Sequence, residues 1–287
     1  MTIAIYGSRR QGENVTRIAR MLATLHDRGV EIVMHSKLYR HLRSEIPGDQ
    51  PVDRVVGDEP FEADLAISLG GDGTFLRTAR WVGQMSIPIV GVNTGHLGYL
   101  TAFRIEEIGE MVDDLLSGNF GIERRTLLKA ECADGTPLGD YPYALNEVAI
   151  LKTEDASMIT CTVNIDGASP ARYQADGLIV STPTGSTGYN LSVGGPIIEP
   201  TAAVLVLSPI AAHSLTMRPL VISDSNRMTV ETTCRSRSFL VSLDGNSCQL
   251  PAGTVIVIEK ARFETLVIQR GGHRFTDTLR DKLMWGI

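Results

Sequence analysis

The chain has 287 residues, 43% of them hydrophobic and 21% charged, a composition that is typical of globular proteins and excludes a disordered, collagen-like or coiled-coil chain. A formal net charge of −6 makes nucleic acid a poor partner, because neutralising phosphates requires a basic surface. No apolar run approaches the roughly 18 residues that span a bilayer, and the first residues lack the long apolar stretch of a signal peptide. We therefore expect neither nucleic acid nor a membrane as a partner.

The four cysteines are Cys132, Cys161, Cys234 and Cys248. They form no C-x-x-C pair, and no histidine lies at zinc-finger spacing. We interpret them as reduced thiols, which predicts a cytoplasmic protein.

Strands and helices alternate over the first hundred residues. Apolar segments predict strands at 2–6, 31–34, 64–69 and 87–92. Apolar residues at helical spacing predict one helix from about Val15 to Gly29 and another after Thr74, with Leu76, Ala79 and Val82 on its buried face. The segment 36–60 is polar and reads as a loop with one short helix at most. The alternation predicts an α/β domain with a parallel sheet and helices on both faces.

After residue 100 the pattern changes. One more amphipathic helix is predicted at 105–115, and alternation with period two then dominates. Strands are predicted at 127–132, 144–151, 159–165, 228–232, 239–243, 254–258 and 265–269. Short strands separated by Asp-Gly turns predict a mainly antiparallel β domain. A terminal helix at 277–285 needs a partner, so we expect the tail to return to the first domain.

The strongest functional signal is the loop Gly70-Gly71-Asp72-Gly73-Thr74, between a predicted strand and a predicted helix. Glycines let a ligand approach the main chain, and amides at a helix N-terminus bind phosphate oxygens. The loop has neither the Gly-Lys-Ser/Thr of a P-loop nor Rossmann spacing. A carboxylate here repels phosphate unless it acts as a base or holds Mg²⁺. The alternative is a tight turn with Asp72 as helix cap.

A second loop, residues 176–196, combines glycines and small hydroxyl residues after an apolar run. It offers amides and hydroxyls to a ribose or a base, and the ring of Tyr189 is suited to lie against another ring. It has no G-x-S-x-G elbow, which argues against a hydrolase serine. The alternative is a Gly/Ser-rich turn between two strands.

Two further segments are candidates. Asn146 and Glu147 lie in an otherwise apolar predicted strand, where polar side chains are costly unless paired; either they bind ribose hydroxyls or they form an ordinary solvent-facing pair. The segment 91–98 follows the fourth predicted strand. Ligands of parallel sheets bind at this edge, so we expect it beside the loop at Gly70, although a domain hinge is also consistent with the pattern.

In this order, the four segments resemble those of the NAD kinase family, enzymes of ATP- or polyphosphate-dependent type that phosphorylate NAD to NADP. The segments 209–220 and 275–285 and the pair Asp244-Gly245 extend the resemblance over nearly the whole chain. The Gly-Gly-Asp-Gly-Thr loop is shared with lipid kinases of the diacylglycerol and sphingosine type. The Asn-Glu pair and the segment 184–189 are more specific.

The resemblance implies a role for each matching residue. Asp72 would be the general base for the 2′-hydroxyl of the adenosine ribose, and Phe75 would line the adenine pocket. The residues implied to hold phosphates are Gly70, Gly71, Gly73 and Thr74. Those implied to bind NAD are Asn146, Glu147, Asp176, Thr184, Thr187, Gly188, Tyr189 and Ser192. Gly188 departs from the pattern, since many members have alanine there.

The resemblance also implies Mg²⁺ or another divalent cation bound with the donor, and a homo-oligomer, dimer or tetramer, whose sites are completed across subunits. Residues 1–100 with about 270–287 would form the nucleotide-phosphate domain, and residues 101–269 the NAD-binding and oligomerisation domain. Two alternatives stay open. One is a lipid kinase, which would need an apolar cleft or a membrane-facing patch. The other is a non-catalytic NAD(P)-binding regulator in which Asp72 only caps the helix.

Overall fold

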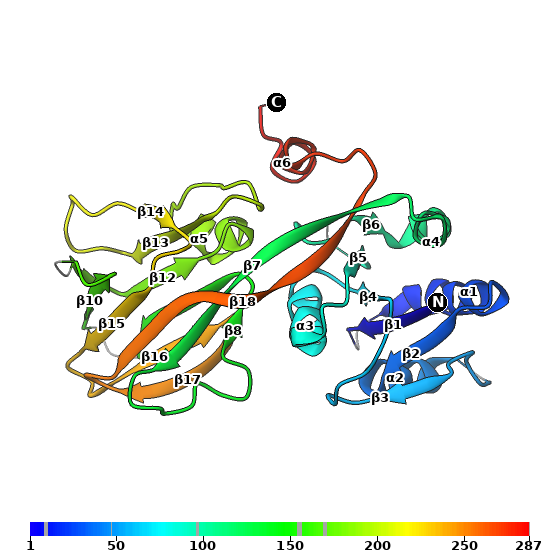
Figure 1. Ribbon diagram of the computed structural model, residues 1–287, viewed down its shortest axis with the longest axis horizontal. Helices are drawn as coiled ribbons and strands as arrows, with labels where there is room; N and C mark the ends of the chain where they lie inside the picture. The colour runs from blue at the N-terminus through cyan, green and yellow to red at the C-terminus, as the bar shows by residue number, and fades with distance from the viewer. Residues whose placement is uncertain (9–10, 47, 96–97, 154–156, 169–170, 287) are drawn as a thin grey trace. The chain divides into compact units, whose positions relative to one another are not determined.

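The computed structural model describes residues 1–8, 11–46, 48–95, 98–153, 157–168 and 171–286. The chain forms two compact units (Figure 1). Unit 1 comprises Met1–Arg124 and Thr265–Ile287, and unit 2 comprises Arg125–Glu264. Within the described residues, no helix is long and apolar enough to cross a membrane.

Unit 1 is built on a parallel sheet. Its central strands are β1 (Thr2–Gly7), β2 (Glu31–His35), β3 (Arg54–Val56), β4 (Leu65–Leu69) and β5 (Ile89–Asn93), in the order β3-β2-β1-β4-β5. The short β6 (Phe103–Arg104) pairs in parallel with β5, as does the end of the long strand β18 (Val255–Arg270). The predicted parallel sheet is confirmed.

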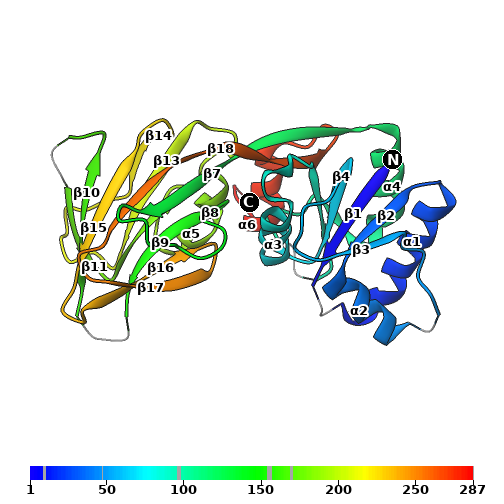
Figure 2. The ribbon, with the colours of Figure 1, turned by 60° about the horizontal axis from the view of Figure 1, so that its bottom comes forward.

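Helices cover both faces of this sheet (Figure 2). They are α1 (Val15–Asp27), α2 (Ser36–Glu45), α3 (Asp72–Val82) and α4 (Ile108–Ser117), with 3-10 turns at Gly12–Asn14, Gly83–Met85 and Ile105–Glu107. A further helix, α6 (Phe275–Leu283), follows β18. Ile3 and Ile5 share a core with the apolar faces of α1, α2 and α4. Tyr6, from the opposite face of β1, lies against Trp81 of α3, with ring centroids 5.5 Å apart.

Three details of unit 1 differ from the sequence-based expectation. The segment 36–60 contains the one short helix expected there, α2, and also the unexpected strand β3, whose three residues are mostly exposed. Leu76 is only half-buried, whereas α3 buries Phe75 and Thr78 beside the expected Ala79 and Val82. The unit continues to Arg124 because Met111, Val112 and Leu115 of α4 belong to its core.

Unit 2 is a sandwich of two sheets. One contains β7 (Phe120–Cys132), β8 (Tyr143–Ala144), β10 (Ile159–Ile165), β11 (Ala171–Ala175), β15 (Met228–Thr233) and β18. The other contains β9 (Glu147–Lys152), β12 (Gly177–Ser181), β13 (Val204–Ile210), β14 (Leu220–Ser223), β16 (Ser238–Leu243) and β17 (Asn246–Pro251), all antiparallel. Inward side chains such as Val163, Ile150 and Phe239 form one core. The predicted antiparallel β domain is confirmed.

Several expectations for unit 2 need correction. The predicted strands 254–258 and 265–269 are one strand, β18, because no glycine or proline interrupts the residues between them. The predicted strand 144–151 is broken, since β8 ends at Ala144 and β9 begins at Glu147. Asn146 therefore lies in the break rather than within a strand.

The C-terminal tail belongs to unit 1, so the predicted return to the first domain is confirmed. The predicted terminal helix is α6, which buries Leu279, whereas Leu283 and Met284 at its end are 38% and 76% exposed.

Candidate active site

The glycine-rich loop joins β4 to α3. Gly70 has φ +155°, and an ideal Cβ there would lie 2.4 Å from Thr74 Oγ1, so the turn requires glycine. An ideal Cβ at Gly71 would meet nothing within 4 Å, and one at Gly73 only Arg77 Nη1 at 3.8 Å. The amide of Thr74 bonds back to the carbonyl of Gly71 at 2.8 Å. The amides of Gly71, Asp72 and Gly73 precede the first bond of the helix, and N-terminal helix amides of this kind suit a phosphate.

Asp72 does not cap α3, because Gly71 occupies the N-cap position. Its Oδ2 accepts a hydrogen bond of 2.7 Å from the amide of Tyr99, and its Oδ1 one of 2.9 Å from the amide of Leu100. An ideal Cβ at Gly98 would lie 2.0 Å from Asp72 Oδ1. The capping interpretation is thus wrong, and the carboxylate instead ties α3 to the loop that follows β5.

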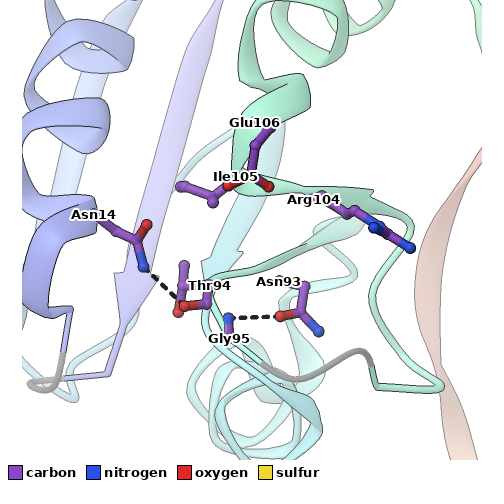
Figure 3. Close-up of a pocket in the computed structure, with 7 residues that line it drawn as sticks. All are labelled: Asn14, Asn93, Thr94, Gly95, Arg104, Ile105 and Glu106. Atoms are coloured by element: carbon purple, nitrogen blue, oxygen red, sulfur yellow. Dashed lines mark hydrogen bonds between the residues drawn. The ribbon is translucent and has the colours of Figure 1, made fainter.

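A pocket of about 350 Å³ lies at the carboxyl end of β5 (Figure 3). It is lined by Asn14, Asn93, Thr94, Gly95, Arg104, Ile105 and Glu106. Asn14 Nδ2 donates to the carbonyl of Thr94 at 2.8 Å, and Asn93 Oδ1 accepts from the amide of Gly95 at 2.7 Å. Because the amide of Gly70 donates to the carbonyl of Val92, the predicted proximity of this edge to the glycine-rich loop is confirmed. His96 and Leu97 of the same motif lie outside the described residues.

Two residues expected at the ligand are buried. Phe75 is 0% exposed, and its Cδ2 would lie 3.1 Å from an ideal Cβ at Gly91. Thr74 is also buried, and its Oγ1 accepts a hydrogen bond from Arg77 Nη2 at 3.0 Å. Both side chains pack inside the protein beneath the loop backbone. A contact of either side chain with a nucleotide stays a prediction.

Tyr99 is an aromatic residue of the site that the motif analysis did not single out. Its side chain lies next to Asp72, and burial together with that carboxylate raises the pKa of its phenol. The hydroxyl is buried without a hydrogen-bond partner among the described residues, and Lys282 Nζ lies 5.5 Å from the ring centroid. Its position directly after the Gly-His-Leu-Gly segment is the sequence signal that could have identified Tyr99.

In unit 2, the break between β8 and β9 displays Asn146 and Glu147. An ideal Cβ at Gly188 would lie 3.2 Å from both Asn146 Nδ2 and Glu147 Oε2, so the two side chains converge on that glycine. The carboxyl group of Glu147 also accepts a backbone hydrogen bond from Tyr189. The structure thus brings together four of the predicted NAD-binding residues.

The two acidic groups at this break are strongly perturbed. Burial raises the pKa of Glu147 to about 7, and the neighbouring carboxyl of Asp244 adds to the shift. Burial likewise raises the pKa of Asp244 to about 6, against the effect of three backbone amides that favour its charged form. Glu147 Oε2 and Asn146 Oδ1 are buried and have no partner within the described part of the chain. Unsatisfied buried acceptors of this kind point to a ligand that donates hydrogen bonds.

The predicted loop after β12 is a compact hydrogen-bonded unit formed by a 3-10 turn at Thr184–Thr187 and the short helix α5 (Tyr189–Ser192). Asn190 is fully buried at its centre, donating to the carbonyls of Ser186 and Pro196 and accepting from Ser208 Oγ at 2.6 Å. This network holds the neighbouring Tyr189, which is 38% exposed. The segment that joins β12 to β13 is therefore a hydrogen-bonded, preorganised surface, and the binding of a ribose or base to it stays a prediction.

The remaining predicted residues differ in exposure. Ser192 is exposed, Thr187 is half-buried, and Thr184 is buried, with its Oγ1 3.4 Å from Arg125 Nη1. Asp176 forms an ion pair of 2.8 Å with Lys152 Nζ, and both side chains are about one-third exposed. No group of three or more His, Cys, Asp or Glu side chains in the described ranges is placed to hold a metal ion.

A glycine-rich loop that offers helix amides beside a fixed carboxylate is typical of a phosphotransferase. Residues 3–120 match the ATP-NAD kinase N-terminal domain, and residues 145–270 match the ATP-NAD kinase C-terminal domain. The chain is 43% identical to an NAD kinase of Bacteroides fragilis over 286 residues, which covers 100% of this chain and 98% of that protein. It is also 43% identical to an NAD kinase of Porphyromonas gingivalis, covering 99% of this chain and 98% of that protein.

Solved structures agree with these matches. An NAD kinase from Archaeoglobus fulgidus, solved in complex with ATP, superposes with a TM-score of 0.73 at 28% identity and with 96% of each chain covered. Yeast NADH kinase, solved with NADH, gives a TM-score of 0.87 over 100% of this chain and 88% of that one; at 21% identity this likeness concerns the fold alone. The chain belongs to the NAD kinase family, and the lipid-kinase alternative is set aside.

Proposed function

We propose that this chain transfers the terminal phosphoryl group of ATP to the 2′-hydroxyl of the adenosine ribose of NAD, giving NADP. The observation that carries the proposal is the Asp72 carboxylate, fixed by the amides of Tyr99 and Leu100 at the N-terminus of α3. The named relatives are NAD kinases, and one solved relative holds ATP. NAD as acceptor and ATP as donor are proposed on that basis.

Asp72 takes the proton of the attacking hydroxyl. Each oxygen of its carboxylate accepts one backbone hydrogen bond, which leaves each oxygen a second lone pair for the substrate. The 2′-oxygen then forms a bond to phosphorus while the bond from phosphorus to the leaving phosphate oxygen of the donor breaks. Positioning supplies much of the rate in such transfers, so a base held at two points is suited to the task.

The donor phosphates lie on the amides of Gly71, Asp72 and Gly73 in this proposal, because that end of α3 carries partial positive charge. A divalent cation fits the site in the manner usual for Mg²⁺, which is held by one or two carboxylates, substrate phosphates and water rather than by a protein cage. Asp72 is the residue that would contact it. The cation would neutralise the charge of the transferring group.

The NAD side of the proposal rests on unit 2. Asn146 and Glu147 offer their unsatisfied acceptors to donors of the adenosine moiety. The exposed ring of Tyr189 covers a ring of the dinucleotide, and Gly188, whose amide bonds to the carbonyl of Gly185, leaves room beside Asn146 and Glu147. We assign the flanking residues Asp176, Thr184, Thr187 and Ser192 to the rest of the dinucleotide-binding surface.

We further propose that the protein is a homo-oligomer. Leu220 and Val221 of the edge strand β14 are 43% and 45% exposed, and Leu215 before it is 90% exposed. Apolar residues on an unpaired strand edge favour pairing with another chain. Light scattering after size-exclusion chromatography tests this, and replacing Val221 by lysine should shift the mass toward a monomer.

A cytoplasmic location stays a prediction, and the four free cysteines are compatible with it.

The identity of the phosphate donor is tested directly. The protein is incubated with Mg²⁺ and NAD together with either ATP or polyphosphate, and NADP is read with an NADP-specific dehydrogenase. Formation of NADP with ATP supports the proposal. Formation of NADP only with polyphosphate would show that polyphosphate, and not ATP, is the donor. Calorimetric binding of NAD without turnover from either donor would instead support the non-catalytic regulator.

A further inference from the structure

Asp244 and Gly245 form the two-residue turn of the β16–β17 hairpin. Leu243 and Asn246 pair on either side, and the two turn residues have φ +47° and +84°. These angles are those of a type I′ turn, which asparagine followed by glycine satisfies as well as aspartate followed by glycine. The turn itself therefore does not require a carboxylate at residue 244.

The Asp244 carboxylate nevertheless makes three hydrogen bonds to a distant part of the chain. Oδ2 accepts from the amide of Leu145 at 2.7 Å, and Oδ1 accepts from the amides of Asn146 and Glu147 at 2.9 and 3.1 Å. Burying a carboxylate is costly, and three amides are an unusually complete compensation. The amides of Leu145 and Asn146 lie in the break between β8 and β9, and that of Glu147 is at the start of β9.

The break determines where the next side chains point. Asn146 and Glu147 reach Gly188, and each has a buried oxygen that no other described residue satisfies. A regular strand through residues 144–151 would send Asn146 and Glu147 to opposite faces of the sheet. The interrupted backbone instead lets both side chains reach the same glycine. Asp244 holds the amides of the interruption, while Thr182 binds the carbonyls of Leu145 and Asn146.

We propose that Asp244 is a positioning residue for the reaction: its carboxylate holds the Leu145–Glu147 backbone in the broken conformation that presents Asn146 and Glu147 together to the adenosine part of NAD. The inference rests on the proposed function, because it takes NAD as the molecule received there. Asp244 itself need not touch the substrate.

The test is Asp244→Asn, with Asp166→Asn as matched control. Asp166 is also followed by glycine, has φ +48°, and accepts a backbone hydrogen bond, from Arg227 at 2.8 Å. Both substitutions turn Asp-Gly into Asn-Gly, which keeps the backbone preference and removes a carboxylate. Assays run at about pH 8.5, above the pKa of Glu147 of about 7, keep that group charged in both variants.

We expect Asp244→Asn to raise the KM for NAD about tenfold or more, with kcat within about threefold of wild type, since contacts to the adenosine moiety are made in both ground and transition state. Asp166→Asn should leave both constants unchanged. In a protein that already carries Asn146→Ala, adding Asp244→Asn should raise the KM much less than it does in the wild-type protein, because both substitutions act through the same segment.

An Asp244→Asn variant with wild-type KM, or with a lowered kcat at unchanged KM, would overturn the proposal. Hydrogen exchange of the wild-type protein needs no variant: the amides of residues 145–147 should exchange slowly before NAD is added, and fast exchange that slows only with NAD would equally overturn it. Failure of the proposed function is distinguishable, because the wild-type protein would then form no NADP at all.

Discussion

Asp72 Oδ2 lies 2.7 Å from the amide nitrogen of Tyr99, and the other carboxylate oxygen binds the amide of Leu100. The first residue of α3 is thereby joined to the loop that leaves β5. One side chain serves two purposes in this arrangement, as the proposed base and as a structural tie. A substitution of Asp72 therefore changes both the chemistry and the loop.

Replacing Asp72 by asparagine should lower kcat by about 10²- to 10⁴-fold, the usual contribution of a general base. It should also lower Tm, because the new side-chain NH₂ faces a backbone N–H and at least one of the two hydrogen bonds is lost. Steady-state kinetics and thermal unfolding measure the two effects separately. A reduced Tm with turnover near that of wild type would leave Asp72 as a structural tie only.

Gly98→Ala tests the placement of the same carboxylate without altering its chemistry. The added methyl group would lie 2.0 Å from Asp72 Oδ1, so either the carboxylate or the loop must move. We expect kcat to fall about 10²-fold, as displacement of a catalytic group by about 1 Å does. Gly109→Ala in α4 is the control, because no atom lies within 4 Å of the added carbon. Equal activity of the two variants would contradict the assigned geometry.

The fold could be predicted from the sequence where a single pattern of apolar residues determines the secondary structure. The strand–helix alternation of the first ninety residues predicted the parallel sheet, because central strands are apolar on both faces. Segments at the sheet edge, such as β3, were missed since a short exposed strand has no apolar pattern. The break at Asn146 was also missed, because the backbone there bonds to Asp244, about a hundred residues later in the chain.

The site residues divide in the same way. The glycine-rich loop and the Asn146-Glu147 pair could be found from residue types alone. The packing role of Phe75 and the place of Tyr99 beside Asp72 could not, since both depend on how β5 and α3 meet. A motif names the residues of a loop, but only the tertiary contacts show which side chains face outward.

The stability of the wild-type protein relative to Glu147→Gln should fall as pH rises. Burial raises the pKa of Glu147 from 4.5 to about 7, so its protonated form is favoured in the folded state. The contribution of the protonated Glu147 carboxyl group to the free energy of unfolding is fully present below about pH 4.5 and is lost as pH rises through 7. Glutamine stays neutral throughout this range.

Thermal unfolding at several pH values between 5 and 8 checks this, with an expected relative loss on the order of 5 °C in Tm. A wild-type protein that gains stability over Glu147→Gln as pH rises would show that the folded state favours the charged carboxylate instead.

Tyr189→Ala should raise the KM for NAD by about tenfold while changing kcat little, because ring contacts are largely uniform binding. The side chain is 38% exposed, so Tm should change little. Tyr189→Phe keeps the ring and should behave like wild type. A loss confined to kcat would show that Tyr189 acts on the transferring group rather than on NAD binding.

The position of the transferred phosphate tests the central claim most directly. The wild-type protein is incubated with Mg²⁺, ATP and either NAD or its analogue lacking the 2′-hydroxyl of the adenosine ribose, and the products are identified by mass spectrometry and ³¹P NMR. The account predicts one new phosphate monoester on the 2′-oxygen of NAD and no product from the analogue. Phosphorylation of the analogue, or of another hydroxyl of NAD, would contradict it.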